Sequence, residues 1–159
     1  LPADLSEIKG AIIANLPGNI AERELATTGS LLGWGPDELF MRGRTDVTGP
    51  GNCLVLTMEY EHCREVVTAF GRVGATSEAV AGEAAEEARA YLACAAPVGV
   101  HLADQLILPM ALTAGGRFIT ANPSTHLLTN IEVVRLFLDA QISMTEREDG
   151  CWMVTVQTS

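Results

Sequence analysis

The apolar residues of this chain change their spacing repeatedly, from every second position to every third or fourth, with glycine and proline at the changes. Strict alternation is typical of a half-buried strand, and the wider spacing is typical of an amphipathic helix. The clearest strand pattern is CLVLTMEYEH at residues 53–62, and the clearest helix pattern is the alanine- and glutamate-rich stretch at 77–92, with Thr76 or Ser77 as its N-cap. Because helices and short sheets alternate, the sequence predicts an α+β fold.

The same patterns predict the remaining elements. We expect strands at residues 8–16, 38–47, 53–62, 64–70, 117–121, 141–146 and 152–157. We expect helices at residues 20–32, 77–92, 98–113 and 125–138. The helix at 98–113 is apolar nearly all round, which predicts that it is buried, and Pro109 should break or bend it.

Composition limits the classes of protein to consider. The chain has 159 residues, 48% of them hydrophobic, so it can bury about two thirds of its unfolded surface in one compact domain or two small ones. Its apolar runs are too short to span a bilayer and its start lacks a signal-peptide pattern, which predicts a soluble, non-secreted protein without a membrane partner. The formal net charge of -10 disfavours broad electrostatic binding to nucleic acid, so any RNA contact must be local or supplied by another chain.

The four cysteines are Cys53, Cys63, Cys94 and Cys151. They form no CxxC pair and no Cys/His group at zinc spacing. We therefore expect buried free thiols, which fit a cytoplasmic location.

Two of the expected helices carry polar residues near their starts, at the same spacing. Each set has a histidine followed by polar residues three and four positions later: His101, Asp104 and Gln105 in the first, and His126, Thr129 and Asn130 in the second. Residues at this spacing share one helix face. They need partners, because burying an unpaired polar group costs about 1 to 3 kcal/mol.

A histidine in the first turn of a helix has two interpretations. The free backbone N–H groups and the positive partial charge there suit a phosphate, and the same field keeps an imidazole neutral and nucleophilic. His126 could therefore attack phosphorus. In the alternative, His126 only hydrogen-bonds a neighbouring loop and Asp104 only complements its helix dipole. Residue spacing alone leaves both open.

The string GPGN at residues 49–52 is glycine-rich and raises the possibility of a phosphate-binding loop. Such a loop precedes a helix, whereas GPGN precedes an expected strand. We therefore interpret it as a plain turn.

Six strings along the chain resemble one known family. They are GPGN (49–52), VVTAFG (66–71), YLA (91–93), VGVHLADQLILPMAL (98–112), NPSTHLLTN (122–130) and IEVVRLFL (131–138). In this order they are similar to the C-terminal half of the RNA 3'-terminal phosphate cyclases. The HLADQ and PSxHLLTN blocks are the most specific of them.

The resemblance implies an ATP-dependent reaction in three steps. A histidine takes AMP from ATP, AMP passes to the 3'-phosphate of an RNA, and the neighbouring 2'-hydroxyl displaces AMP to leave a 2',3'-cyclic phosphate. The family's nucleophile falls on His126, and its adenylate-binding stretch falls on His101, Leu102, Ala103, Asp104 and Gln105. In that stretch His101 would stack on adenine, Asp104 would be needed for activity and Gln105 would contact the nucleoside.

The resemblance also implies the domain organisation. Residues 1–96 resemble the family's small inserted α/β domain of thioredoxin-like shape, and residues 97–159 resemble the end of its large catalytic domain. Members are about twice as long as this chain, and their other half carries the glycine-rich signature, the metal-binding glutamate and the phosphate-binding arginines. We therefore expect a partner, the N-terminal half of a cyclase, to hold the divalent cation, Mg or Mn. The alternative is a remnant of a broken or proteolysed chain, and the start at Leu1 in place of methionine leaves processing, a missing start and a cut from a longer chain open.

Two other functions are left open. Some eukaryotic relatives of the cyclases act in ribosome assembly and lack the nucleophilic histidine, so the presence of His126 argues against that role. A small RNA-binding module is the other alternative, and the net charge of -10 disfavours it.

Overall fold

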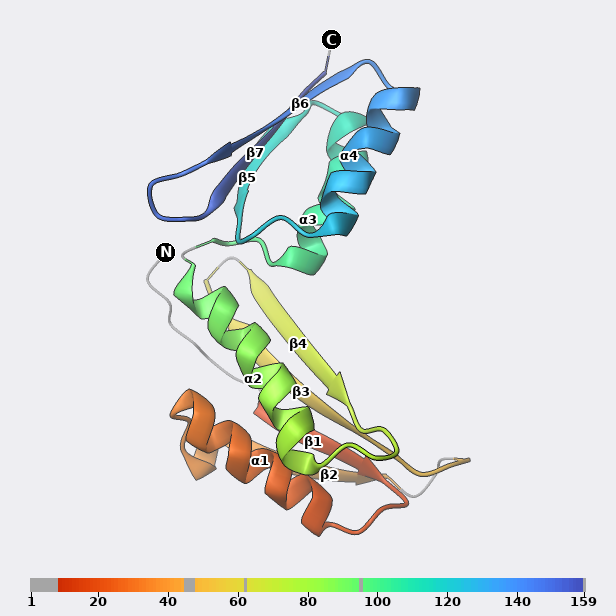
Figure 1. Ribbon diagram of the computed structural model, residues 1–159, viewed down its shortest axis with the longest axis vertical. Coiled ribbons are helices and arrows are strands. Elements are labelled where there is room, and N and C mark those ends of the chain that lie inside the picture. Colours follow the sequence, from red (N-terminus) through yellow and green to blue (C-terminus); the bar gives the residue numbers. More distant parts are fainter. Residues whose placement is uncertain (1–8, 45–47, 62, 95, 159) are drawn as a thin grey trace. The chain divides into compact units, whose positions relative to one another are not determined.

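The computed structural model describes residues 9–44, 48–61, 63–94 and 96–158. The chain forms two compact units, Leu1–Arg89 and Ala90–Ser159. Each unit combines helices with one sheet (Figure 1), so the fold is α+β as predicted. The predicted domain boundary after residue 96 stays a prediction. Within the described residues, no helix has the length and apolar character needed to cross a membrane.

The first unit is built on a four-stranded sheet. Its elements are β1 (Lys9–Ala14), α1 (Asn19–Leu32), the short 3-10 helix η1 (Pro36–Glu38), β2 (Leu39–Arg44), β3 (Gly51–Glu59), β4 (Arg64–Phe70) and α2 (Ser77–Ala93), which continues past Arg89. The strand order is β2-β1-β3-β4, with β1 and β2 parallel and the other pairs antiparallel. A β-α-β half is thus followed by a β-β-α half, as expected for the thioredoxin-like shape.

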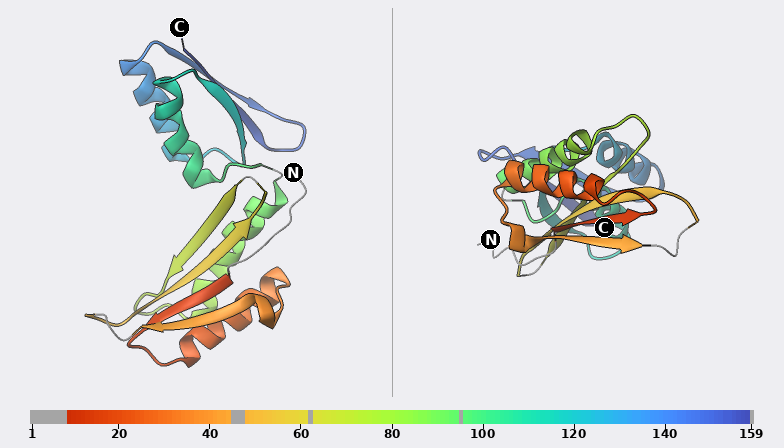
Figure 2. Two further views of the ribbon diagram at one scale, coloured as in Figure 1. Left: turned by 180° about the vertical axis from the view of Figure 1, so that it is seen from behind. Right: turned by 90° about the horizontal axis from the view of Figure 1, so that it is seen from below.

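Both helices of the first unit cover the same face of its sheet (Figure 2). The covered face carries the alternate positions of the strands: Ala11, Ile13, Leu54, Leu56, Met58, Val67 and Ala69 are all buried. Ile12, Val66 and Phe70 lie on the opposite face and are exposed. The alternation seen in the sequence therefore separates a helix-covered face from an open one.

Local chemistry sets the ends of these helices. The Thr76 hydroxyl accepts a hydrogen bond from the backbone N–H of Ala79 at 3.2 Å, so Thr76 is the cap of α2. The helix α1 ends where Gly33 adopts a left-handed conformation with φ 70°, which glycine allows without a steric penalty. The expected strand ends at residues 8, 45–47 and 62 lie outside the described residues.

The second unit places two helices on one face of a three-stranded antiparallel sheet (Figure 1). Its elements are α3 (Val100–Ala111), β5 (Gly116–Thr120), α4 (Thr125–Phe137), β6 (Ala140–Glu146) and β7 (Trp152–Thr158). The strand order is β5-β7-β6. The core between the layers contains Ile107 from α3, Leu127 and Ile131 from α4, and Val154 from β7, all buried.

The structure of α3 differs from the predictions in two respects. The helix runs through Pro109 to Ala111, so the predicted break is absent, while the alternative of a bend stays a prediction. Pro109 lies in the last turn on an exposed face, so the backbone hydrogen bond that it cannot donate is lost where water can replace it. The helix is also not buried all round: Ala103, Ile107 and Ala111 are buried, whereas Leu102 and Leu108 are exposed.

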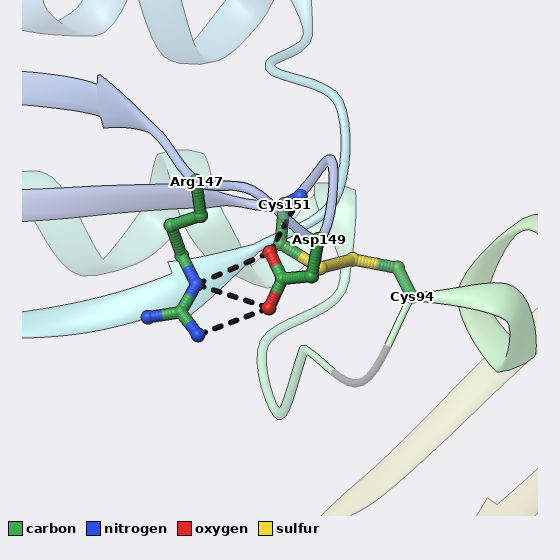
Figure 3. A network of polar contacts seen from close by, with 4 residues as sticks. All are labelled: Cys94, Arg147, Asp149 and Cys151. Atoms are coloured by element: carbon green, nitrogen blue, oxygen red, sulfur yellow. Dashed lines mark hydrogen bonds and ion pairs between the residues drawn. A yellow bond between two sulfur atoms is a disulfide. The ribbon is translucent and has the colours of Figure 1, made fainter.

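The expectation of four free thiols is wrong for one pair. Cys94, which follows α2, and Cys151, at the start of β7, are joined in a disulfide (Figure 3), while Cys53 and Cys63 are free. Beside it, Asp149 accepts hydrogen bonds from Arg147 and from the Cys151 backbone, which lower the pKa of its carboxyl. The 57-residue separation left no local signal for this pairing, and the cysteines no longer support a cytoplasmic location.

Candidate active site

The start of α4 presents His126 to solvent. Ser124 is the N-cap, and its Oγ accepts a hydrogen bond from the backbone N–H of Leu127 at 3.1 Å. The fully buried Leu127 anchors this first turn in the core. His126, the second residue of the helix, is exposed, and no described residue bonds its ring. The ring is therefore available to a substrate.

The start of α3 repeats this arrangement without a side-chain cap. Gly99 precedes the helix in an extended conformation, and His101 is again the second helical residue and exposed. The Gln105 side chain donates from Nε2 to the His101 carbonyl at 2.8 Å. Leu102 is exposed, whereas Ala103 is buried in the core. The side chains of His101 and Gln105 thus lie on the outer side of the helix, and that of Asp104 is half-buried.

One hydrogen bond joins the two helix starts. Asn130 Nδ2 on α4 donates to the backbone carbonyl of Asp104 on α3 at 3.2 Å. The contact brings together members of the two polar sets, although they are 26 residues apart in the sequence. By contrast, Thr129 bonds within its own helix, to the carbonyl of Thr125 at 2.8 Å.

A pocket of about 490 Å³ lies along the junction of these helices. Its polar end is formed by Asp104, Gln105 and Asn130, and its apolar part includes Leu108 and Phe137. His101 and His126 do not line it. Three of the six polar residues therefore line one pocket, whereas the two histidines are not among its lining residues.

Asp104 has one unusual atom. Its Oδ1 is covered and has no hydrogen-bond partner among the described residues. Leaving such an acceptor unpaired costs free energy that a ligand donor could recover. Asp104 thus has the chemistry of a ligand-binding carboxylate.

The described part of the chain contains no group of three or more His, Cys, Asp or Glu side chains placed to hold a metal ion. The cation expected for an ATP reaction thus has no cluster of donors among these residues.

Sequence reasoning did not identify Ser124 as the cap that fixes the position of His126. The signal was available, since a serine directly before a helical pattern is a common N-cap.

Comparison with known proteins extends the sequence resemblance. Residues 4–93 match the family model described as the RNA 3'-terminal phosphate cyclase (RTC), insert domain. The chain is 43% identical over 148 residues to the RNA 3'-terminal phosphate cyclase of Koribacter versatilis, covering 93% of this chain and 41% of that protein. It is 43% identical over 155 residues to that of Salmonella agona, covering 94% and 42%. It is 36% identical over 149 residues to that of Pseudomonas aeruginosa, covering 94% and 44%.

These alignments run across both units, and the chain spans about two fifths of the length of the curated relatives that it matches. The family model covers most of the first unit, and the relatives' similarity continues through α3 and α4. By descent, the chain belongs to the RNA 3'-terminal phosphate cyclase family.

Proposed function

We propose that this chain is the C-terminal part of an enzyme that converts an RNA 3'-phosphate into a 2',3'-cyclic phosphate at the expense of ATP. In the first step a ring nitrogen of His126 attacks the α-phosphorus of ATP. A P–N bond forms, the bond to the bridging oxygen breaks and pyrophosphate leaves. AMP then passes to the RNA 3'-phosphate, and the adjacent 2'-hydroxyl displaces it. We keep the cytoplasm as the proposed location because the proposed reaction uses ATP and RNA, although the Cys94–Cys151 disulfide removes the support that free thiols gave it.

The observation that carries the proposal is the position of His126. It is exposed at the second position of a capped helix, where free backbone N–H groups and the helix dipole favour a phosphate. A structural histidine would be expected to have a protein partner, and no described residue bonds this ring. The contact from Asn130 to Asp104 sets the start of α3 beside this helix.

The start of α3 has groups that fit an adenosine. The unpaired Oδ1 of Asp104 can accept a hydrogen bond from a ribose hydroxyl or an amino group. Gln105 lines the same pocket, and the exposed ring of His101 offers a stacking surface for adenine. Leu102 and Ala103 belong to the same stretch and complete the binding segment that we propose.

A second polypeptide segment is part of this proposal. Large apolar side chains on α3, directly after it and on α4 are unusually exposed: Leu108 by 51%, Leu112 by 62%, Leu136 by 79% and Phe137 by 81%. Apolar surface of this kind is typical of an interface. We propose that the N-terminal half of the cyclase, on the same or a separate chain, covers it and supplies the divalent cation and the positive charge for the phosphates.

Transfer of label from α-³²P-ATP tests the nucleophile directly. The chain is mixed with the N-terminal half of a cyclase and MgCl₂ or MnCl₂, and acid-labile label on this chain is measured. Wild type should become labelled, and His126→Ala should not. His101→Ala serves as the matched control, because it removes a histidine at the equivalent position of α3. The His101→Ala variant should need a higher ATP concentration than wild type but should still become labelled at saturating ATP.

The result that contradicts the proposal is equal labelling of wild type and His126→Ala. Absence of label in both, with a folded protein and the N-terminal half present, would instead favour the non-catalytic alternative. Circular dichroism of each variant checks that folding is intact.

A further inference from the structure

The first unit has a pocket of its own, which plays no part in the proposed adenylation. Its volume is about 490 Å³, and it lies where α1, the start of β3, the end of β4 and the start of α2 meet. Leu16, Ile20, Ala75 and Val80 give it apolar walls. Glu24 is among its lining residues although its side chain is fully buried.

Glu24 is held at one oxygen and unpaired at the other. The side-chain amide of Asn52 donates a hydrogen bond to Oε1. Oε2 is covered and has no hydrogen-bond partner among the described residues. A buried carboxylate oxygen normally has a donor, so this one indicates a partner that the chain itself does not supply.

The surroundings of Asn52 are built to keep it in place. Asn52 belongs to the GPGN string and Gly71 to the VVTAFG string, and the Gly71 N–H donates to the Asn52 carbonyl at 3.0 Å. A Cβ at Gly71 would overlap the side-chain oxygen of Asn52, so a larger residue there would displace the Asn52 side chain. Two of the strings that carry the family resemblance therefore meet at this pocket, and GPGN does more than form a turn.

Nearby cations do not neutralise Glu24, because they already have partners. Arg23 forms a two-pronged ion pair with Glu78, at 2.8 and 2.7 Å. Arg72 pairs with Glu83 in the same way. Burial raises the pKa of the Glu24 carboxyl, and the hydrogen bond from Asn52 opposes this rise. The hydrogen-bond donor for Glu24 Oε2 must therefore come from a ligand, because Arg23 and Arg72 are already paired with glutamates.

We infer that this pocket binds one unpaired guanine base of an RNA strand, with its N1–H and N2 amino donors directed to Glu24. Unpaired RNA bases are commonly held between apolar side chains and read along their Watson–Crick edge. Guanine places two donors on that edge, which suits a carboxylate, whereas adenine presents an acceptor at N1. That the ligand is an RNA base rests on the proposed function, whereas the need for a hydrogen-bond donor rests only on the unpaired Oε2 of Glu24.

A base fits better than a protein side chain for two reasons. The apolar walls suit a flat ring, and the rim already holds two arginines, which disfavour a further cation from an arginine or lysine. Because Oε2 is covered, side chains of the pocket wall must move aside before a base can reach it.

Titration of the ¹⁵N-labelled 159-residue chain with nucleoside monophosphates tests the inference. GMP should shift the amide signals of Asn52, Gly71 and Val80. IMP, which lacks the N2 amino group, should bind about tenfold more weakly, and AMP more weakly still. Glu24→Gln should lose about tenfold in GMP affinity. Glu22→Gln, on the exposed side of the same helix, should bind like wild type.

The outcomes separate this inference from the proposed function. His126→Ala should bind GMP unchanged, so failure of adenylation leaves this result intact. Equal binding of GMP and AMP, absence of shifts with GMP, or unchanged affinity in Glu24→Gln each overturns the inference. Stronger competition by N-acetylarginine amide than by GMP would overturn it in favour of a protein ligand.

Discussion

Replacing Glu24 with glutamine should stabilise the first unit by an amount that grows with pH. The glutamine oxygen can still accept the hydrogen bond from Asn52, so the packing and that contact are retained. The change removes the negative charge from a fully buried side chain that has one unpaired oxygen. The glutamine NH2 takes the place of the unpaired Oε2 at every pH, so the pH-dependent part of the difference reports the free energy cost of ionising Glu24.

The sign follows from the pKa. Burial raises the folded-state pKa of Glu24 above its value in the unfolded chain, so the folded protein holds this proton more strongly. The stability that the proton provides is fully present below the unfolded-state pKa and is lost as the pH rises through the folded-state pKa. At pH 4 wild type and Glu24→Gln should thus be nearly equal. Above this range the variant should become the more stable of the two, by about 1.4 kcal/mol for each tenfold by which burial disfavours ionisation of Glu24.

Urea unfolding at a series of pH values from about 4 to 8 measures this difference. Trp34 belongs to the first unit and Trp152 to the second, so a Trp152→Phe background lets fluorescence report the first unit alone. Glu22→Gln is the control, and because Glu22 is exposed its effect should be small at every pH. A stability difference for Glu24→Gln that stays constant with pH, or shrinks as the pH rises, would refute the reasoning.

Three further predictions concern the second unit. Ser124→Ala should lower the free energy of unfolding by about 1 kcal/mol, because it removes the cap of α4, and should slow the labelling of His126. Ser124→Asp can still cap the helix and should keep the stability and the labelling rate of wild type; urea unfolding and ³²P transfer measure the two. Asn130→Ala should cost about 0.5 to 1.5 kcal/mol in the same unfolding assay, because it removes the bond to the Asp104 carbonyl. Phe137→Ser should change stability by less than about 0.5 kcal/mol, because this side chain is 81% exposed, but should weaken binding of the N-terminal half in a pull-down.

The sequence predicted the positions of helices and strands well because their limits depend on local chemistry. The strand expected at 64–70 is β4 (Arg64–Phe70), and the helix expected at 125–138 is α4 (Thr125–Phe137). Thr76 caps α2 through its own hydroxyl, and Gly33 ends α1 through its own backbone conformation. Such signals can be read within a few residues of the position that they determine.

Features that depend on distant residues were missed. Nothing in the local pattern indicates that β1 pairs with β2 in parallel and with β3 in antiparallel orientation. The bond between Cys94 and Cys151 joins residues 57 positions apart. The pocket at Glu24 was also missed, because α1 carries several acidic and polar residues and only the fold shows which of them is buried.

The polar sets of α3 and α4 show that polar residues on one helix face do not all belong to a binding site. The argument from sequence was that polar side chains on these helices need partners, but Gln105 and Thr129 find theirs on the preceding turn of their own helices. Such bonds are available to these residue types in any helix and do not indicate a ligand. Asn130 bonds across to α3 and thereby positions one helix start beside the other. Two groups in these sets have no partner among the described residues, the exposed ring of His126 and the covered Oδ1 of Asp104, and they carry most of the site that we propose.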